Sequence, residues 1–495
     1  MEQNLGNKLV KGTLWVVAAR LGLRGISVIS TIVLAWLLTP ADFGIVAMAS
    51  IVTTLMTAFT EIGMNQVIIY YKNVGKDFYD TAWTIQMIRG LILGLLMILL
   101  SNVLASFFRE QLLVPVFRVL SIVFVLNGMV STNLVVFQKE MHFDKEFYYK
   151  IFTQIICLIG TLSLAIWLRN YWAMVLGNII FSLSCVVLSF WYVPGLPKLT
   201  LLHWRKIFAF SQWVFLREAS GNISQKLDQI LIGRWFDKTS IGQYDMATQI
   251  ATLPATEIAM PLSRTLFPAL AKLQDQPEQF RYMLSISLAS VLLITLPASC
   301  GLMMVANPLV SFLLPTSWEQ TGWMIQILTL YGLVRVTYSP CTSALTAQGK
   351  VNEVFYISFS SLILKCGILY LGYIYNGLVG IAWGTVISGL IITILYLWSV
   401  CRHNYLNITV LLKQICRPVI ASFTMIGSVY AIQQAVVSMK YCAQVEVIAM
   451  VMTGVVAYTF VLLGSWWIIG KPEGIETRLL TMLSEAIKKL KAKTK

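Results

Sequence analysis

The chain has 495 residues, of which 57% are hydrophobic and 12% are charged, and its formal net charge is +15 at pH 7. Soluble proteins of this length are not so apolar, so an integral membrane protein is predicted. The sequence contains no nucleotide-binding or metalloprotease motif, and its eight cysteines and three histidines form no metal-binding pattern. ATP hydrolysis, metal chemistry and covalent catalysis by this chain are therefore not expected.

Apolar segments of about 20 residues follow one another along nearly the whole chain, and each could cross a hydrocarbon core of about 30 Å as a helix. Because the first segment contains arginines and lacks a small-residue cleavage site, it is interpreted as a retained span rather than a signal peptide. We predict an all-α, polytopic membrane protein with about 14 transmembrane helices, at 13–37, 43–64, 81–104, 112–136, 149–168, 172–193, 207–233, 241–267, 282–305, 322–347, 353–374, 377–400, 416–437 and 444–469.

The basic residues are divided unequally between alternate loops. If the N-terminus is cytoplasmic, the inward loops and the tail hold 23 Lys and Arg, and the outward loops hold five. This asymmetry predicts that both termini are cytoplasmic and explains most of the net charge without nucleic-acid binding. The tail at 471–495 places Ile475, Leu479 and Leu483 on one helical face beside lysines. An amphipathic helix on the anionic inner leaflet is predicted, with a partner-binding helix as the alternative.

A short turn occurs in both halves of the chain. WLLTPADFG at 36–44 resembles RWFDKTSIG at 234–242, and an offset of 198 residues aligns 8–55 with 206–253 without a gap at nine identical positions. Both aligned segments carry polar side chains at helical spacing, so they are predicted to line a shared polar space. The offset aligns the stripe Arg20, Arg24, Ser27 and Thr31 with Glu218, Asn222, Gln225 and Gln229.

The two copies begin six segments apart, so they have the same orientation and are related by an axis along the membrane normal. The loop at 137–152 also resembles the sequence at 347–359 in the second half. We predict an N-terminal six-helix lobe at 1–198, a C-terminal six-helix lobe at 199–403, two additional transmembrane helices at 404–470 and the basic tail. Two similar lobes around a central site are typical of alternating-access transporters.

Fourteen charged residues fall inside the predicted spans. Each would cost at least ~2.5 kcal/mol facing lipid at the bilayer centre, and together they would exceed the ~5–15 kcal/mol that stabilises a typical fold. They must therefore face a wet cavity, pair with one another or reach an interface. The cations are Arg20, Arg24, Arg89, Arg118, Arg217, Lys226, Arg264, Arg335 and Lys365, and the acids are Glu61, Glu218, Asp228, Asp245 and Glu257.

Structural explanations are available for some of these residues. Arg118 and Arg264 are near segment ends, where long side chains can reach the interface. Ion pairing is the alternative for Glu61 with Arg89, Arg217 with Glu218, and Lys226 with Asp228. A cavity role is favoured for the deep cations without a local acid, which are Arg20, Arg24, Arg335 and Lys365. The net charge of +4 predicts a cavity for an anion, and guanidinium groups suit phosphate.

The repeated LTPADFG turn, the arginines of the first segment, the FQKEMHF loop and the 14 spans resemble the Wzx-type lipopolysaccharide and colanic-acid exporters. These form the polysaccharide-exporting branch of the multidrug/oligosaccharidyl-lipid/polysaccharide flippase superfamily, whose fold is MATE-like. The resemblance implies a transporter of the bacterial inner membrane and not an enzyme. It would flip an undecaprenyl-diphosphate-linked oligosaccharide to the periplasmic leaflet for O-antigen or exopolysaccharide biosynthesis, with the polyprenyl tail in lipid along the two extra helices.

The resemblance and the charges together suggest site residues. The family's arginines in the first and eighth spans correspond to Arg20, Arg24 and Arg264. The substrate-binding candidates are Arg20, Arg24, Arg89, Arg217, Arg264, Arg335, Lys365, Asn222, Gln225 and Gln229. The candidates for coupling to a proton or sodium gradient are Glu61, Glu218, Asp245 and Glu257. No cofactor is expected, and the implied partners are the lipid-linked glycan, membrane lipids and, as an open alternative, a polysaccharide polymerase.

Two other functions are alternatives to a flippase. A cation-coupled multidrug exporter of the same superfamily should have a net acidic cavity, whereas the predicted cavity is basic. A membrane-embedded glycosyltransferase needs catalytic acids on a sizeable loop or domain, and no loop here exceeds about 20 residues. The identity of the glycan, the coupling ion and the oligomeric state are left open by the sequence.

Overall fold

The computed structural model describes residues 2–60, 68, 75–140, 142–195, 197–438 and 443–468. The side chains of 2–14, 16–17, 138, 206–220, 258–265 and 437 are outside the described part. Every regular element within the described residues is helical, which agrees with the all-α prediction. The chain forms two compact units, Met1–Gln243 and Tyr244–Lys495.

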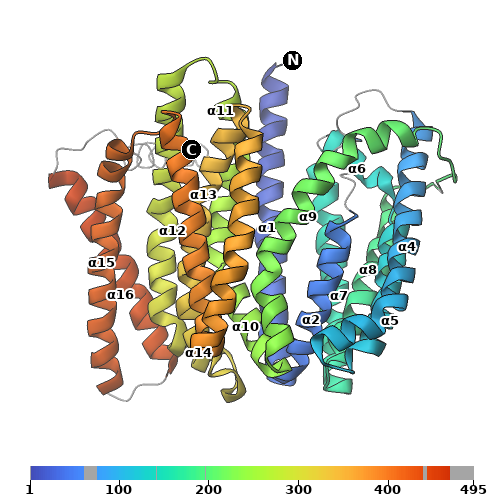
Figure 1. The fold of residues 1–495 in the computed structure, drawn as a ribbon, viewed down its shortest axis with the longest axis horizontal. Helices are drawn as coiled ribbons and strands as arrows, with labels where there is room; N and C mark the ends of the chain where they lie inside the picture. The colour runs from blue at the N-terminus through green and yellow to red at the C-terminus, as the bar shows by residue number, and fades with distance from the viewer. Residues whose placement is uncertain are drawn as a thin grey trace, which may run out of the picture. The chain divides into compact units, whose positions relative to one another are not determined.

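Unit 1 contains long helices packed along one another (Figure 1). α4 packs on α5, α5 and α7 pack on α8, and α1 packs on α7. α9 packs on α2 and on α4. The helices are α1 (Glu2–Leu37), α2 (Pro40–Ala58), α4 (Lys76–Phe108), α5 (Leu113–Met129), the short η1 (Thr132–Leu134) and α6 (Val135–Lys139), α7 (Phe143–Leu168), α8 (Trp172–Tyr192), α9 (Trp204–Trp235) and the start of α10 (Lys238–Ala251).

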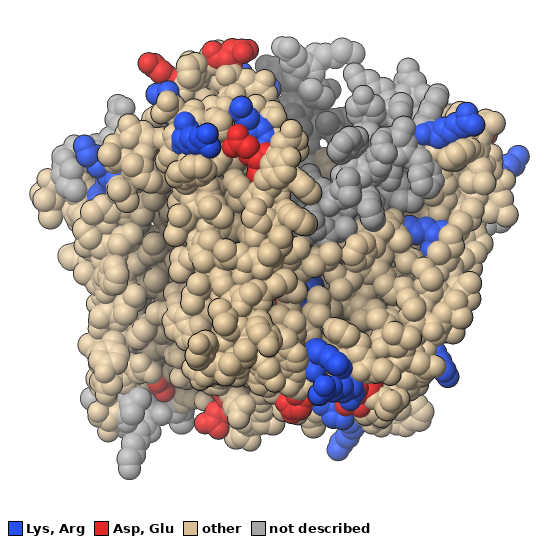
Figure 2. Space-filling model, viewed as in Figure 1, with Lys and Arg blue, Asp and Glu red and all other residues tan. Residues whose placement is uncertain are grey.

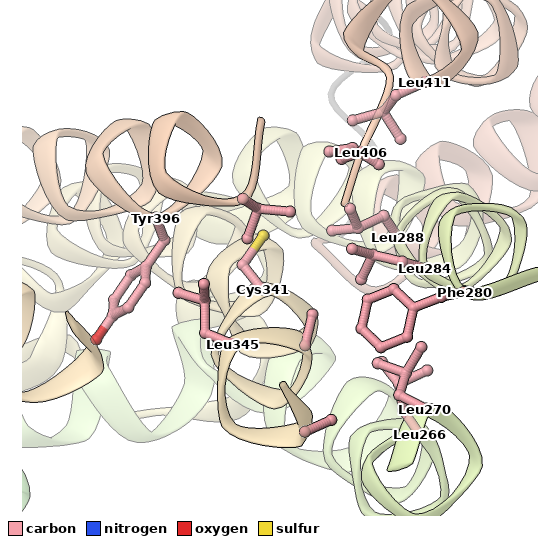
Figure 3. Close-up of a cluster of buried hydrophobic side chains, with 13 residues drawn as sticks. Leu266, Leu270, Phe280, Leu284, Leu288, Cys341, Leu345, Tyr396, Leu406 and Leu411 are labelled. Carbon is pink, nitrogen blue, oxygen red and sulfur yellow. The ribbon is translucent and has the colours of Figure 1, made fainter. Parts of the chain in front are cut away.

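Unit 2 is built around α12, α13 and α14, with α15 and α16 paired beside α12 (Figure 1). Its elements after α10 are the π-helix η2 (Ala255–Ala259), α11 (Met260–Ala271), α12 (Pro277–Leu313), η3 (Thr316–Trp318), α13 (Thr321–Ala347), α14 (Val351–Arg402), α15 (Ile408–Ser438) and α16 (Ala443–Ile468). Figure 3 shows a buried apolar core from five of these elements and the α14–α15 connection: Leu266, Leu270, Phe280, Leu284, Leu288, Cys341, Ala344, Leu345, Ala347, Tyr396, Val400, Leu406 and Leu411.

The repeated turn starts α2 and α10 with equivalent caps. The Asp42 amide donates to the Thr39 hydroxyl (3.3 Å), and the Thr39 amide donates to the Asp42 carboxylate (3.0 Å), which forms a capping box. In the second copy the Ser240 amide donates to the Asp237 carboxylate (3.2 Å). The 198-residue offset aligns Thr39 with Asp237 and Asp42 with Ser240. Acid and hydroxyl have exchanged places, yet both helix starts are capped.

α14 consists of two helical arms joined by a sharp kink. Asn376 and Gly377 leave the helical conformation, and Gly377 has a φ of +52°, which glycine adopts without a Cβ penalty. The arms then approach closely, because a Cβ on Gly380 would lie 1.9 Å from the Gly372 carbonyl oxygen. The kink falls at the boundary predicted between the spans at 353–374 and 377–400.

Each of the 14 predicted segments is mostly helical where the structure describes it, but fewer helices qualify as spans by length and hydropathy. Among the described residues nine qualify, with both arms of α14 counted as one. The predicted spans that are not counted separately are the second arm of α14, the short α5, and the segments of α9, α10–α11 and α13. A polytopic helical membrane protein is therefore confirmed, and 14 crossings stay a prediction.

The protein surface agrees with immersion in lipid. On the face shown in Figure 2, most charged side chains gather toward the ends of the helices. Large apolar side chains are exposed along the helices, for example Leu99 on α4 (65%) and Phe460 on α16 (79%). Such exposure is unfavourable in water and expected against acyl chains.

The compact units differ in extent from the predicted lobes. Unit 1 extends to Gln243 because α9 and the first turns of α10 contact α2 and α4. The division into lobes at 1–198 and 199–403, with additional helices at 404–470, rests on the sequence repeat and stays a prediction. The predicted amphipathic tail at 471–495 lies outside the described residues.

Candidate functional site

Lys365, on the first arm of α14, is a predicted cavity cation that the structure buries. Only 5% of the residue is exposed. Its Nζ lies 5.7 Å from the centroid of the Tyr331 ring on α13. An ammonium over an aromatic face is attracted by the ring quadrupole, and more strongly where water is excluded. Tyr331 therefore helps to hold a positive charge inside unit 2.

Arg335 lies four residues after Tyr331 on α13 and donates a hydrogen bond to the Tyr338 hydroxyl. Arg335 and Lys365 both act electrostatically on that hydroxyl, so the two cations share one neighbourhood. The Tyr338 ring stacks on Tyr396 of the second arm of α14, with centroids 5.7 Å apart. We call Tyr331, Arg335, Tyr338, Lys365 and Tyr396 the cation–tyrosine cluster.

Tyr396 joins this cluster to the apolar core. It lies at the edge of the core in Figure 3, with its hydroxyl directed away from Cys341 and Leu345. That hydroxyl is 2.7 Å from the Ser358 hydroxyl and donates to the Val354 carbonyl at 3.2 Å. Residues from both arms of α14 and from one face of α13 thus form the cluster.

Arg335 and Lys365 were predicted from the sequence by their charge, whereas the tyrosines of the cluster were not predicted. Tyr331, Arg335 and Tyr338 are separated by four and three residues, which places them on one face of α13. The same spacing had marked the polar stripe of the first segment. Helical spacing around Arg335 is therefore the signal that identifies its neighbours.

Two predicted coupling acids lie in the described part of unit 2. The Asp245 carboxylate accepts from the Gln249 side-chain amide at 2.8 Å. Glu257 lies in the π-helix η2 and accepts from the Thr256 hydroxyl at 3.3 Å. π-Helical turns are uncommon and occur frequently at functional sites. Both acids are half-buried.

In unit 1, Arg20 and Arg24 are half-buried on α1, which packs against α7. Ser27 and Thr31 complete the predicted polar stripe of this helix. The Thr31 hydroxyl donates to the Ser27 carbonyl at 2.9 Å, so its hydrogen bond is satisfied within the helix. The arginines therefore supply the charge of this stripe.

The predicted amides of α9 have different surroundings. Asn222 is half-buried, Gln225 is exposed and Gln229 is buried. The Lys226 ammonium donates to the Gln229 side-chain oxygen at 2.7 Å. The structure shows this contact of Lys226 with Gln229, and the ion pair of Lys226 with Asp228 stays a prediction.

Arg89 connects α4 with the end of α2. Its guanidinium donates to the Thr60 hydroxyl (2.9 Å) and to the Thr57 carbonyl (3.1 Å). A cation at a helix C-terminus satisfies free carbonyl groups and interacts favourably with the helix dipole. This contact is structural, and Glu61, the predicted partner of Arg89, lies outside the described residues.

The side chains of Arg217, Glu218 and Arg264 fall outside the described part. Within the described residues, no three His, Cys, Asp or Glu side chains gather where they could hold a metal ion. The groups that the structure does place are cations, tyrosine hydroxyls and single acids, which are suited to binding an anion and exchanging a proton.

Comparison with known proteins identifies the family. The model of a family described as "Polysaccharide biosynthesis protein" matches residues 33–323. The chain belongs to this family. It is 24% identical to the lipopolysaccharide biosynthesis protein WzxC of Escherichia coli (strain K12) over 401 residues, which cover 79% of this chain and 80% of WzxC. It is 22% identical to the teichuronic acid biosynthesis protein TuaB of Bacillus subtilis (strain 168) over 470 residues, covering 94% and 97%.

Solved structures confirm the fold of this family member. A structure of the lipid II flippase MurJ in an inward closed conformation matches with a TM-score of 0.74 and 15% identity, over 92% of this chain and 99% of MurJ. An inward-facing multidrug resistance MATE transporter matches with a TM-score of 0.61 and 15% identity, over 79% and 94%. The chain thus has a MATE-like and MurJ-like fold. It is a multi-pass membrane protein of the polysaccharide biosynthesis family and shares the fold of these two solved structures.

Proposed function

We propose that the protein flips an undecaprenyl-diphosphate-linked oligosaccharide repeat unit from the cytoplasmic to the periplasmic leaflet of the bacterial inner membrane. Two six-helix lobes, at 1–198 and 199–403, provide alternating access to a central cavity. Fourteen helices cross the membrane, both termini are cytoplasmic, and the polyprenyl tail remains in lipid. Family membership and the sequence repeat support this mechanism.

The observation that carries the proposal is the cation–tyrosine cluster. A buried lysine and a nearby arginine inside membrane helices are costly, and cations retained at such positions usually mark a substrate path. Lys365, Arg335 and the tyrosine hydroxyls supply hydrogen-bond donors and positive charge, which complement the oxygens of a diphosphate. Within unit 1, the guanidinium groups of Arg20 and Arg24 on α1 offer the same chemistry.

Four carboxylates are the proposed link between the transport cycle and an ion gradient. Glu61, Glu218, Asp245 and Glu257 would couple flipping to a proton or sodium gradient. Asp245 and Glu257 are half-buried, and Glu257 lies on the π-helix η2 between two α-helical segments. A turn of this kind can change its hydrogen bonding when the carboxylate changes its charge.

The functional alternatives fit the described residues less well. A cation-coupled multidrug exporter, although it has a related fold, would bind cationic cargo beside Lys365 and Arg335 against like-charge repulsion. A membrane-embedded glycosyltransferase would need catalytic acids on a sizeable extramembrane loop or domain, and the fold that this chain shares with a flippase and a multidrug transporter supports transport instead.

The experiment that tests the proposed function follows the lipid-linked oligosaccharide in a strain without the protein. We expect the repeat unit to accumulate in the cytoplasmic leaflet, where mass spectrometry identifies its sugars. Wild-type protein should restore export, whereas Arg24→Ala and Arg335→Ala should not, at normal membrane abundance. Normal appearance of the glycan outside the deletion strain would contradict the proposal.

A further inference from the structure

The fourth predicted span, at 112–136, is interrupted in unit 1 by a short unwound segment. α5 ends at Met129, Val130 and Ser131 adopt ψ angles of 134° and 121°, and η1 follows. We call Val130 and Ser131 the α5 interruption. The fourth span of the second half, at 322–347, is instead the continuous helix α13. Irregular backbone inside a membrane is tolerated where protein buries it, and the C-terminal ends of interrupted helices can coordinate cations.

Side chains of α4 hold the interrupted end of α5 in place. The Trp83 indole donates to the Met129 carbonyl at 3.1 Å, and the Gln86 amide donates to the Asn127 carbonyl at 2.8 Å. Each of these carbonyl oxygens has a second lone pair. Because the C-terminal end of a helix also carries a partial negative charge, the electrostatics here favour a cation.

Asp80 is a buried acid on α4 beside the α5 interruption, and only 2% of the residue is exposed. The Thr132 hydroxyl of η1 donates to the Tyr79 carbonyl at 3.1 Å, which brings η1 against α4 one residue before Asp80. Successive helical residues are rotated by about 100°. Asp80 therefore lies between Trp83, which contacts the end of α5, and Thr84, which contacts the connection between α8 and α9.

The surroundings of Asp80 offer oxygen atoms and no compensating charge. Within the described residues, no side chain donates a hydrogen bond to its carboxylate. Lys198, whose backbone carbonyl accepts from the Thr84 hydroxyl at 3.4 Å, is exposed. The Ser131 hydroxyl is likewise buried without a hydrogen-bond partner in the described part of the chain. An uncompensated buried carboxylate is costly, and a bound cation would remove that cost.

We propose that Asp80 binds a sodium ion, together with hydroxyl and carbonyl oxygens at the α5 interruption, and that this ion fastens the end of α5 to α4. Hard cations take carboxylate, hydroxyl and carbonyl oxygens as ligands. No three His, Cys, Asp or Glu side chains of the described residues gather around a common point, so the single acid suits a monovalent ion better than a divalent one. Asp80 precedes the predicted span at 81–104 by one residue, and is therefore not among the predicted coupling acids.

Sodium binding to the purified full-length protein tests this site without any lipid substrate. Sodium chloride should raise the thermal midpoint of the wild type above its value in choline chloride of equal ionic strength, because the ion binds the folded state. Asp80→Asn keeps the shape of the side chain and removes its charge. It should weaken the binding of one radioactive sodium ion per protein by roughly tenfold or more. Asp77→Asn is the matched control, because Asp77 is exposed in the first turn of the same helix, and it should bind sodium as the wild type does.

A milder variant keeps the test decisive if Asp80→Asn does not fold. Ser131→Ala removes one hydroxyl at the α5 interruption and should also weaken sodium binding. Equal midpoints of the wild type in the two salts, or unchanged sodium binding by both variants, would overturn the site. A midpoint that responds to pH and not to sodium would assign a proton to Asp80 and would overturn it as well. If sodium binds as expected while the protein moves no lipid-linked oligosaccharide, the proposed function is wrong and the sodium site stands.

Discussion

Replacing Lys365 with methionine separates a binding role from a structural one. Methionine keeps most of the length and volume of the side chain and removes its charge. Because Lys365 is 5% exposed inside unit 2, removing a cation from the membrane interior should not impair insertion. A buried lysine costs roughly 2.5–3.5 kcal/mol on insertion scales, so the abundance and thermal stability of Lys365→Met should equal or exceed the wild type.

The same Lys365→Met substitution should weaken the binding of an anionic substrate. A hydrogen bond to a charged group contributes about 1.5–3 kcal/mol, which corresponds to a roughly 10- to 150-fold weaker affinity when it is lost. The assay is flipping of lipid-linked oligosaccharide at several concentrations in proteoliposomes, with thermal unfolding measured on the same preparations. We expect the half-saturating concentration to rise by one to two orders of magnitude.

Lys365→Arg serves as the control, because it keeps the charge and the contact with the Tyr331 ring. It should recover part of the lost affinity. Unchanged flipping by Lys365→Met would refute the role of this charge in binding. A fall in flipping matched by an equal fall in folded protein would show that Lys365 acts through stability alone.

Three further predictions concern neighbouring contacts. Tyr338→Phe removes the acceptor for Arg335 and should slow flipping up to about tenfold without lowering abundance, as measured in the same liposomes. Arg89→Gln breaks the hydrogen bond to the Thr60 hydroxyl and the cap on α2, and should lower the free energy of unfolding by ~1–3 kcal/mol, seen as a lower thermal midpoint. Burial opposes ionisation of Asp237, but hydrogen bonds from Ser240 outweigh it and lower the pKa of Asp237. The stability advantage of wild type over Asp237→Asn should therefore be full above about pH 5 and disappear as the pH falls through that lowered pKa, in a pH series of thermal unfolding.

Apolar segment length predicted the helices well because a bilayer imposes its own thickness on each crossing. Even the break between the spans at 353–374 and 377–400 coincides with the kink at Asn376 and Gly377. The span at 241–267 was less well predicted, since the structure divides it into α10, the π-helix Ala255–Ala259 and α11. Periodicity over such a segment cannot show a local widening of the helix.

Prediction of the site depended on how unusual each residue type is in a membrane. Arg335 and Lys365 were identified because charges are rare there, whereas Tyr338 and Tyr396 were not, because aromatic residues are common in membrane proteins. The contact of Lys226 with Gln229 depends on a side-chain rotamer, which sequence spacing does not determine.

The repeat was visible in the sequence, but its structural consequence was not. Aligning Gly44 with Gly242 establishes that the two turns are equivalent, and says nothing about the distance between them. Only the structure shows that each glycine accommodates a carbonyl of the other turn. The same contacts explain why α9 and the start of α10 belong to unit 1 rather than to the second predicted lobe.

The most direct measurement of the central claim is flipping by the purified protein. Undecaprenyl-diphosphate-linked oligosaccharide is placed in the inner leaflet of proteoliposomes, and an impermeant glycosidase outside reports its arrival in the outer leaflet. The account predicts that wild-type protein transfers the lipid much faster than empty liposomes do, and that the doubly substituted Arg24→Ala, Arg335→Ala protein does not. Equal rates for wild-type protein and empty liposomes, under either a proton or a sodium gradient, would contradict it.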